Sequence, residues 1–372
     1  MCGIVGYVGH KSVMDILVDG LEQLEYRGYD SSGAAVMCTD DIKVYKAIGK
    51  LNNLREELKK HKGEYENSTM GIGHIRWATH GAPTVLNAHP HTCTCGNLVI
   101  VHNGIIENYK ELREELASTG CVFRSQTDTE VVAHLVARKY SQTKDLAEAV
   151  RLAAKEIDGA YALCVMHNDC KNKLVITKRN APLLVGIGEN EFFAASDVPA
   201  IIKHTKKAMY LLDNQIAVLT PDKIVLTDED GNELPQKIET LPWEPVALSK
   251  MGYKHYMLKE IHEQPDVIRN ILVGKLHAPD EPINLSEVKL TKETLKNLNR
   301  IQIIACGTSL HAAMAGKYLI ENFCNIAVDV EASSEYIYRK TVTDAHTLVI
   351  GVSQSGETAD TLTTKKQSNT KE

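Results

Sequence analysis

The chain has 372 residues, of which 43% are hydrophobic and 24% charged, and its formal net charge is −6. This length allows two or three domains, and the acidic balance disfavours nucleic acid as a partner. No apolar run reaches the ~18–20 residues that span a bilayer, and the N-terminus lacks the pattern of a signal peptide. Nine irregularly spaced cysteines indicate reduced thiols. The sequence therefore predicts a cytoplasmic globular protein.

Cys2 is the strongest candidate for a catalytic residue. Removal of Met1 would leave Cys2 with both a thiol and a free α-amine. An α-amine has a pKa of about 7.7–8.0, so a useful fraction is neutral near pH 7 and can accept the thiol proton. A thiolate that carries its own base is a competent nucleophile. The alternative interpretation is that Cys2 is an incidental small residue before a buried strand.

The first half of the chain predicts alternating strands and helices. Hydrophobic periodicity predicts a strand over 4–8 and an amphipathic helix over 12–25. A Thr-x-x-Glu capping box at 127–130 predicts the start of another helix. Residues 26–33 and the Thr-, Pro-, His- and Gly-rich stretch 78–96 predict loops, and long loops are often functional. Further strands are expected at 34–37, 43–48, 71–77 and 98–102.

The pattern changes twice in the second half. Short strands separated by turn residues predict an antiparallel sheet between 160 and 226. The polar, Pro-containing stretch 228–252 predicts a linker, and a helix containing Pro265 follows near 255–274. Strands that alternate with a helix then predict a parallel, doubly wound sheet. Its elements are expected at 302–305, 310–323, 327–331 and 347–352.

Three polar features could serve a carboxamide substrate of Cys2. Asn103-Gly104 at a strand end offers a side-chain NH₂ beside an unhindered backbone N–H, which is an oxyanion-hole pair. The alternative is an ordinary Asn-Gly turn. Arg76 and Asp128 could bind the carboxylate and the amine of an amino acid, although each could equally be a surface charge or a helix cap.

Two rival chemistries remain open at this point. One is a metal site, whose ligands would be His89, His91, Cys93 and Cys95. These residues alternate strictly along the chain, and such close spacing is tight for four ligands on one ion. A papain-like Cys–His pair is the other, with His74, His80 or His102 as the base. Cys2 leads into a strand, so no helix dipole is expected to lower its pKa.

Two hydroxyl-rich turns follow predicted strands of the second domain. They lie at 305–309 and 353–358, where a parallel strand leads into a helix. Backbone N–H groups at helix N-termini, together with Ser and Thr hydroxyls, form phosphate sites. No lysine of the Walker type is present, which disfavours a nucleoside triphosphate. The alternative is ordinary N-capping by Ser or Thr.

These motifs together resemble the glutamine–fructose-6-phosphate aminotransferase (isomerising) family. The segments similar to its glutaminase domain are 2–6, 26–31, 74–81, 87–91, 102–108 and 127–130. Those similar to the start of its sugar isomerase (SIS) domain are 259–265, 305–309 and 353–358. The resemblance implies an αββα N-terminal-nucleophile sandwich, followed by an incomplete doubly wound SIS domain. The implied domains are a glutaminase over 2–240, a linker and connecting helix over 241–284, and a partial SIS domain over 285–372.

The resemblance also implies the roles of individual residues. Cys2 is the expected nucleophile, Arg27 and Gly28 help to hold its terminus, and Asn103 and Gly104 form the oxyanion hole. The residues expected to bind glutamine are Arg76, Trp77, Thr79, His80, His89 and Asp128, of which Trp77 also gates the path of ammonia. The residues expected to bind sugar phosphate are Thr308, Ser309, Ser353, Gln354, Ser355 and Thr358.

The implied reaction converts L-glutamine and fructose 6-phosphate to glutamate and glucosamine 6-phosphate, the first step of hexosamine biosynthesis. No cofactor and no metal are expected, and members of the family form homo-oligomers. The resemblance ends near Thr361, before the family's second SIS subdomain with its acid–base residues. The chain is therefore expected to hydrolyse glutamine without making the amino sugar. The alternative is a non-catalytic remnant that binds glutamine or a partner chain.

Overall fold

The computed structural model describes residues 2–78, 81–241, 253, 255–272, 290–340, 344–354, 358 and 360–364. The chain forms two compact units, Met1–Tyr256 and Met257–Glu372. Most of the expected linker, from 242 to 252 and from 273 to 289, lies outside the described residues. Within the parts of the chain that are described, no helix is long and apolar enough to cross a membrane.

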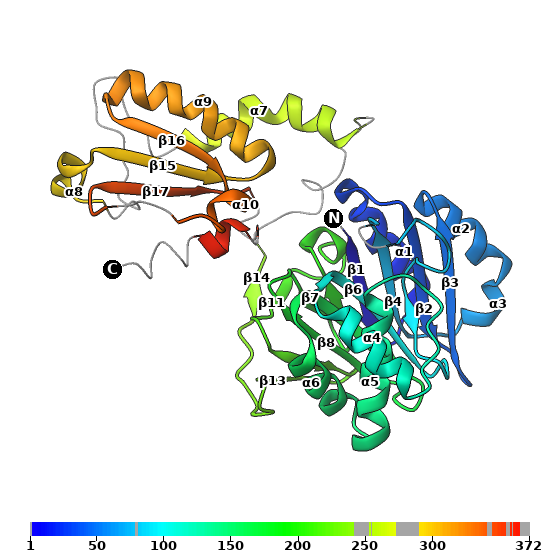
Figure 1. Cartoon of the computed structure of the whole chain (residues 1–372). Helices are drawn as coiled ribbons and strands as arrows, with labels where there is room; N and C mark the ends of the chain where they lie inside the picture. The colour runs from blue at the N-terminus through cyan, green and yellow to red at the C-terminus, as the bar shows by residue number, and fades with distance from the viewer. Residues whose placement is uncertain are drawn as a thin grey trace. The chain divides into compact units, whose positions relative to one another are not determined.

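Two antiparallel sheets form the centre of the first unit (Figure 1). The eight-stranded sheet has the order β14-β11-β9-β10-β1-β4-β2-β3. Its strands are β1 (Gly3–Val8), β2 (Ser31–Met37), β3 (Ile42–Ile48), β4 (Met70–Arg76), β9 (Leu184–Ile187), β10 (Phe192–Ala195), β11 (Lys207–Tyr210) and β14 (Glu239–Thr240). The six-stranded sheet has the order β13-β12-β8-β7-β6-β5. Its strands are β5 (His91–Thr92), β6 (Leu98–Ile106), β7 (Gly159–His167), β8 (Leu174–Arg179), β12 (Ile216–Leu219) and β13 (Ile224–Thr227).

Helices cover the outer face of each sheet, which confirms the expected αββα sandwich. Helix α1 (Val13–Gln23) packs on β1 and β4, and α2 (Leu51–Lys60) packs on β3. On the other side, α5 (Thr129–Thr143) packs on β6, and α6 (Leu146–Glu156) packs on β8. The remaining short elements are α3 (Lys62–Tyr65), α4 (Tyr109–Ser118) and the 3₁₀ turns η1 (Glu25–Arg27) and η2 (Val198–Ala200).

The strand that follows Cys2 lies in the middle of the eight-stranded sheet. Successive side chains of a strand point to opposite faces, and β1 is apolar on both. Val5 and Tyr7 join the core beneath α1, whereas Ile4 and Val8 join the core between the sheets. Burying one such side chain contributes roughly 1.5–3 kcal/mol. Pairing with β4 and β10 on its two sides gives Cys2 a rigid attachment.

The structure differs from the sequence-based expectation at Asn103-Gly104. Strand β6 does not end in a turn there, because it continues in register with β7 as far as the pair Ile106–Gly159. Helices α2, α4 and α6 and strands β11 and β14 were also not predicted. For α6 a signal existed, since the side chain of Asp145 caps its first turn and accepts from the backbone of Ala147.

The second unit contains a parallel three-stranded sheet, as its sequence predicts. The strand order is β16-β15-β17, and α9 (Gly307–Cys324) packs against β15 and β16. The strands are β15 (Arg300–Ala305), β16 (Ala327–Ala332) and β17 (Thr347–Val352), and the other helices are α7 (Tyr256–Leu272), which contains Pro265, α8 (Lys292–Asn297) and α10 (Ser333–Tyr336). Because β15 and β17 are parallel neighbours, the segments after them emerge at the same edge of the sheet.

Candidate active site

Sheet register places Cys2 beside the end of β4. Strands β1 and β4 are antiparallel with Gly3 opposite Ile75, so the residue before β1 lies beside the residues after Ile75. The backbone N–H of Trp77 donates to Cys2 Sγ at 3.3 Å, and Cys2 Sγ lies 3.7 Å from the carbonyl oxygen of Trp77. The thiol is therefore held at the junction of two central strands.

The environment of Cys2 keeps its thiol protonated. Burial raises the pKa of the Cys2 thiol, and it outweighs the Trp77 N–H and the Arg76 charge, which act in the opposite direction. A raised pKa means that less thiolate is present near pH 7 than in an exposed cysteine. Attack by this sulfur therefore requires a base that removes its proton.

Asn103 lies next to Cys2, and Gly104 follows it on β6. The side-chain Nδ2 of Asn103 donates to the carbonyl oxygen of Cys2 at 3.4 Å. Gly104 has a φ of +124°, and a Cβ at this position would lie 2.0 Å from the carbonyl oxygen of Ala160. Only glycine fits that backbone conformation and that close approach. Strand β6 therefore brings the Asn103 amide to Cys2, and the oxyanion-hole role of Asn103 and Gly104 stays a prediction.

Arg27 braces the start of β1 through a neighbouring segment. Its Nη1 donates to the carbonyl oxygen of Ser196 at 3.3 Å and lies 3.6 Å from Asp197 Oδ2. Ser196 Oγ in turn accepts from the backbone N–H of Ile4 at 3.0 Å. Ser196 was missed from the sequence, because it lies 192 residues from Ile4 and no local motif marks it.

Gly28 and Asp30 fix the loop on the other side of Cys2. Gly28 has a φ of +76°, and a Cβ there would lie 3.0 Å from the ring of Trp77. Asp30 Oδ2 accepts from the backbone N–H of Ala78 at 2.6 Å, and the Asp30 N–H donates to the Arg76 carbonyl oxygen at 2.8 Å. This loop therefore holds the segment that follows β4.

The two charged residues expected to bind an amino acid lie close to these groups in the chain. Arg76 is buried at the end of β4, and its Nη2 donates to the carbonyl oxygen of Gly81 at 3.2 Å. Asp128 is buried, and its Oδ2 accepts from the backbone N–H of Ile106 at 2.9 Å. Arg76 directly precedes Trp77, the partner of Cys2 Sγ, and Ile106 is two residues beyond Gly104 on β6.

The structure describes only some of the other residues that are expected to contact glutamine. Trp77 is 52% exposed, so its ring is accessible to a ligand. His89 is buried, and its Nε2 lies 2.9 Å from Thr129 Oγ1. Thr79 and His80 lie outside the described residues, and their roles stay predictions.

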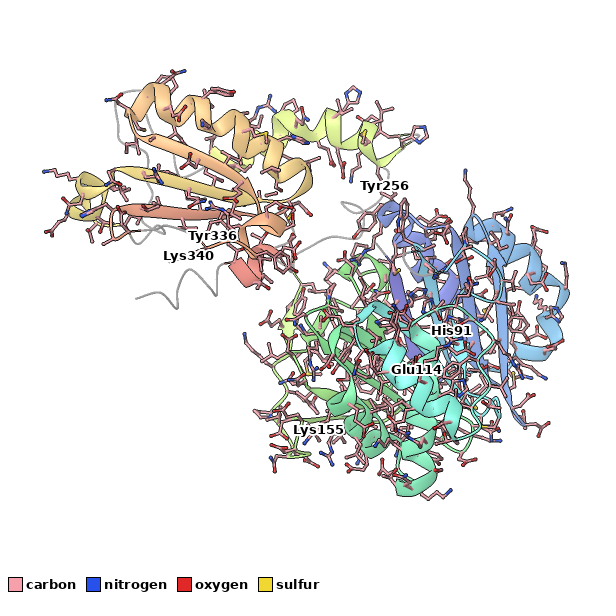
Figure 2. The ribbon with its side chains drawn as sticks, in the orientation of Figure 1. His91, Glu114, Lys155, Tyr256, Tyr336 and Lys340 are labelled. Atoms are coloured by element: carbon pink, nitrogen blue, oxygen red, sulfur yellow. The ribbon has the colours of Figure 1, made fainter. Side chains whose placement is uncertain are left out.

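The described histidines that were considered for the rival chemistries have other partners, and His80 lies outside the described residues. His91 lies inside the first unit, with its Nε2 3.1 Å from Thr127 Oγ1 (Figure 2). His74 Nε2 lies 3.0 Å from both the His102 carbonyl oxygen and Asn103 Oδ1, and His102 Nδ1 lies 2.8 Å from Thr129 Oγ1. Among the residues that the structure describes, no three His, Cys, Asp or Glu side chains gather as metal ligands would.

The hydroxyl-rich segments of the second unit lie at one edge of its sheet. Thr308 and Ser309 are in the first turn of α9, directly after β15. Ser353 follows β17, and its Oγ lies 3.0 Å from Thr358 Oγ1. Gln354 is exposed, and Ser355 lies outside the described residues. The described members of the expected sugar-phosphate set therefore come from two adjacent parallel strands.

Comparison with known protein families identifies two segments. A family model described as a glutamine amidotransferase domain matches residues 46–250. A second model, described as an SIS domain, matches residues 294–371. The two matches fall in the two compact units of the chain.

Curated relatives match nearly the whole chain. The glutamine–fructose-6-phosphate aminotransferase (isomerising) of Symbiobacterium thermophilum is 45% identical over 372 residues, which is 100% of this chain and 60% of the relative. The enzyme of the same name from Methanosarcina acetivorans is 46% identical, over 97% of this chain and 59% of the relative. The chain thus spans about 60% of the length of these relatives.

A solved structure supports the fold. Glutamine phosphoribosylpyrophosphate amidotransferase from B. subtilis superposes with a TM-score of 0.51 at 20% identity, over 95% of this chain and 69% of that one. At this identity the similarity concerns the fold alone.

Proposed function

From the premise that this chain belongs to the glutamine amidotransferase family, we propose that its first unit hydrolyses L-glutamine to L-glutamate and ammonia. The proposal rests mainly on the contacts that Cys2 makes with Trp77 and Asn103. Cys2 Sγ accepts from the Trp77 N–H at 3.3 Å, and Asn103 Nδ2 is 3.4 Å from the Cys2 carbonyl oxygen. The proximity of a thiol and an amide donor supports the proposal.

The proposed chemistry has two steps. After removal of Met1, the α-amine of Cys2 takes the thiol proton, and Sγ attacks the carboxamide carbon of glutamine. The Asn103 NH₂ and the Gly104 N–H stabilise the oxyanion that forms. The protonated amine returns its proton to the leaving nitrogen, the C–N bond of the tetrahedral adduct breaks, and ammonia departs to leave a thioester on Cys2. The neutral amine then takes a proton from water, whose oxygen attacks the thioester carbon; the C–S bond breaks, the proton passes to Sγ, and glutamate is released.

Substrate binding in this proposal uses the two charged residues Arg76 and Asp128. Arg76 binds the α-carboxylate of glutamine, and Asp128 binds its α-ammonium group. Thr79, His80 and His89 are the further residues proposed to contact glutamine, and Trp77 is proposed to gate the path of ammonia. A guanidinium and a carboxylate at opposite ends of the ligand would select an α-amino acid over a simple amide.

Release of glutamate and ammonia by the purified chain tests this function. Equal amounts of the two products are expected when glutamine is the substrate, and no release is expected from the Cys2→Ala variant. If the folded chain with a processed N-terminus releases neither product, the proposal is wrong. Fructose 6-phosphate and glucosamine 6-phosphate are measured in the same samples, which separates the two halves of the relatives' reaction.

Substitution of Arg76 by alanine is expected to raise KM for glutamine roughly 10- to 100-fold, because a hydrogen-bonded charge is worth about 1.5–3 kcal/mol. The turnover number should change less, since the α-carboxylate takes no part in the chemistry. Steady-state kinetics measures both parameters. The matched control is Arg55→Ala on α2, which removes an exposed ion pair with Glu22 on α1. An unchanged KM in folded Arg76→Ala would exclude Arg76 as the anchor.

For the second unit we propose binding of a sugar phosphate, with fructose 6-phosphate as the ligand that the relatives' name gives. The supporting observation is that Thr308, Ser309 and Ser353 follow adjacent parallel strands at one edge. Backbone N–H groups of the first turn of α9 and nearby hydroxyls suit a phosphate dianion. In the longer relatives this site would receive the ammonia and form glucosamine 6-phosphate.

Thr308→Val is expected to weaken binding of fructose 6-phosphate about 5- to 10-fold by loss of one hydroxyl donor. Glutamine hydrolysis should be unchanged, because the substitution lies in the other unit. Calorimetric titration measures the affinity. Thr294→Val on α8 is the matched control, since α8 precedes β15 and the proposed site follows it. Equal affinities of the two variants would contradict the assignment of Thr308.

A further inference from the structure

His74 makes a hydrogen bond that links the two sheets beside the nucleophile. It lies on β4 of the eight-stranded sheet, and its ring is fully buried. Its Nε2 is 3.0 Å from the carbonyl oxygen of His102 and 3.0 Å from Asn103 Oδ1, both on β6 of the six-stranded sheet. Each of these oxygens accepts hydrogen bonds, so Nε2 carries the hydrogen.

The His74 ring is neutral under ordinary conditions. Burial lowers its pKa to about 3, and the neighbouring His102 and Arg76 also act in that direction, against the hydrogen bond with Asn103. A neutral imidazole with hydrogen on Nε2 has no hydrogen on Nδ1. Among the described residues, His74 Nδ1 is buried without a hydrogen-bond partner. The tautomer with hydrogen on Nε2 alone is therefore consistent with the surroundings of both ring nitrogens.

The fixed tautomer determines which way the Asn103 amide faces. A carboxamide has an acceptor end and a donor end, and the Nε2–H of His74 engages the acceptor end. The donor end is then directed to the other side, where Asn103 Nδ2 lies 3.4 Å from the Cys2 carbonyl oxygen. An amide turned by 180° would present oxygen lone pairs to a developing oxyanion and destabilise it.

We infer that His74 is a positioning residue, which holds the Asn103 amide with its NH₂ toward the carbonyl that Cys2 attacks. This inference rests on the proposed hydrolysis of glutamine and deepens it. His74 does not touch the substrate, and it acts only through Asn103. The role differs from that of a catalytic base, because the ring keeps the same protonation state throughout.

Two substitutions of His74 distinguish the effect of the position of the donor nitrogen from the effect of removing the ring. In His74→Gln the amide nitrogen can occupy the position of Nε2, whereas in His74→Asn it reaches only the position of Nδ1. We expect kcat to fall about 10- to 100-fold in His74→Asn, part of the ~10²–10³ that a lost oxyanion donor costs. We expect His74→Gln to recover most of this loss, and KM to change less than twofold in both.

The matched control is His91→Asn, which removes another buried histidine near the same cluster. His91 bonds to Thr127 and not to Asn103. Its kcat per folded molecule should stay within about twofold of the original chain, as expected for a residue outside the site. Equal losses in His74→Asn and His91→Asn, or no recovery in His74→Gln, would show a structural role and overturn the inference.

A double substitution tests whether His74 acts through Asn103. In the Asn103→Ala background, His74→Asn should lower kcat by less than about twofold, because there is no amide left to orient. A full additional loss in the double variant would overturn the inference. The tautomer is read independently of activity from the ¹⁵N shifts of the imidazole. Hydrogen on Nε2 supports the inference, and hydrogen on Nδ1 overturns it.

These measurements also separate the inference from the proposed function. If the unsubstituted chain releases no ammonia, the proposed function fails, and the catalytic consequence assigned to His74 fails with it. The ¹⁵N spectrum still decides whether His74 donates to Asn103. If the chain is active but His74→Asn keeps full kcat, the function stands and the positioning role is wrong.

Discussion

Substitution of Cys2 by alanine is expected to lower glutamine hydrolysis by roughly 10⁴-fold or more, because no thioester can then form. The sulfur lies against the Trp77 N–H, at the start of a strand that is paired on both sides. Glutamate release by the purified variant measures the effect. The matched control is Cys38→Ala, which removes a half-buried thiol that donates to the Glu64 carbonyl oxygen. Its activity should be unchanged.

The α-amine of Cys2 is expected to matter as much as the thiol. Burial raises the pKa of the thiol, so the thiolate is scarce near pH 7 and the proton must go to a base. The amine accepts it only when neutral, so kcat/KM should rise with pH up to the amine pKa of about 7.7–8.0 and then level off. A non-cleavable N-terminal extension should abolish activity, whereas the same extension at the C-terminus should not. Full activity of the N-terminally extended chain would contradict the amine as base.

Asn103→Ala is expected to lower kcat for glutamine about 10²- to 10³-fold with little change in KM, because it removes one donor to the oxyanion. The donor matters most in the transition state, where negative charge has developed on the carbonyl oxygen. Steady-state kinetics at saturating glutamine measures the effect, and circular dichroism checks that the variant is folded.

The matched control for Asn103→Ala is Asn108→Ala. Asn108 lies shortly after β6, and its Nδ2 donates to the carbonyl oxygen of Glu156, away from Cys2. Its kcat should stay within about threefold of the original, as for other substitutions outside a site. A loss below tenfold in folded Asn103→Ala would remove Asn103 from the oxyanion hole.

Local sequence patterns were sufficient to predict β1 and α1, the strand and helix that position Cys2. The apolar run of β1 records burial on both of its faces, and the helical spacing of Leu17, Leu21 and Leu24 records burial in the core under α1. Helix α2 was missed, since only its three leucines are buried and the rest of the helix is polar. A short stripe of this kind is weak evidence in a single sequence.

The expected end of the strand before Asn103-Gly104 was wrong for a physical reason. Asn-Gly favours tight turns in isolation, but here both residues pair with β7, opposite Ala162 and Tyr161. Gly104 keeps the positive φ that this dipeptide permits, while remaining in the strand. Tertiary pairing therefore overrides the local preference, and the conformation still serves the predicted site.

Contacts between distant segments could not be predicted from the sequence. His74 was considered only as a rival base for Cys2, because its bond to Asn103 depends on how two sheets stack. Ser196 joins Arg27 to β1 only in the folded sheet. The charges of an amino acid pointed to Arg76 and Asp128, and the family resemblance supplied the rest of the glutamine-binding set. All of these roles stay predictions until the variants are measured.

Covalent labelling of Cys2 tests the central claim most directly. The purified chain is treated with an electrophile that mimics glutamine, and its mass is measured intact and after digestion. The expected result is a chain without Met1, modified once, on Cys2 alone among nine cysteines, and protected by excess glutamine. Retained Met1 on active protein, or labelling that persists in Cys2→Ala, would contradict an N-terminal cysteine nucleophile.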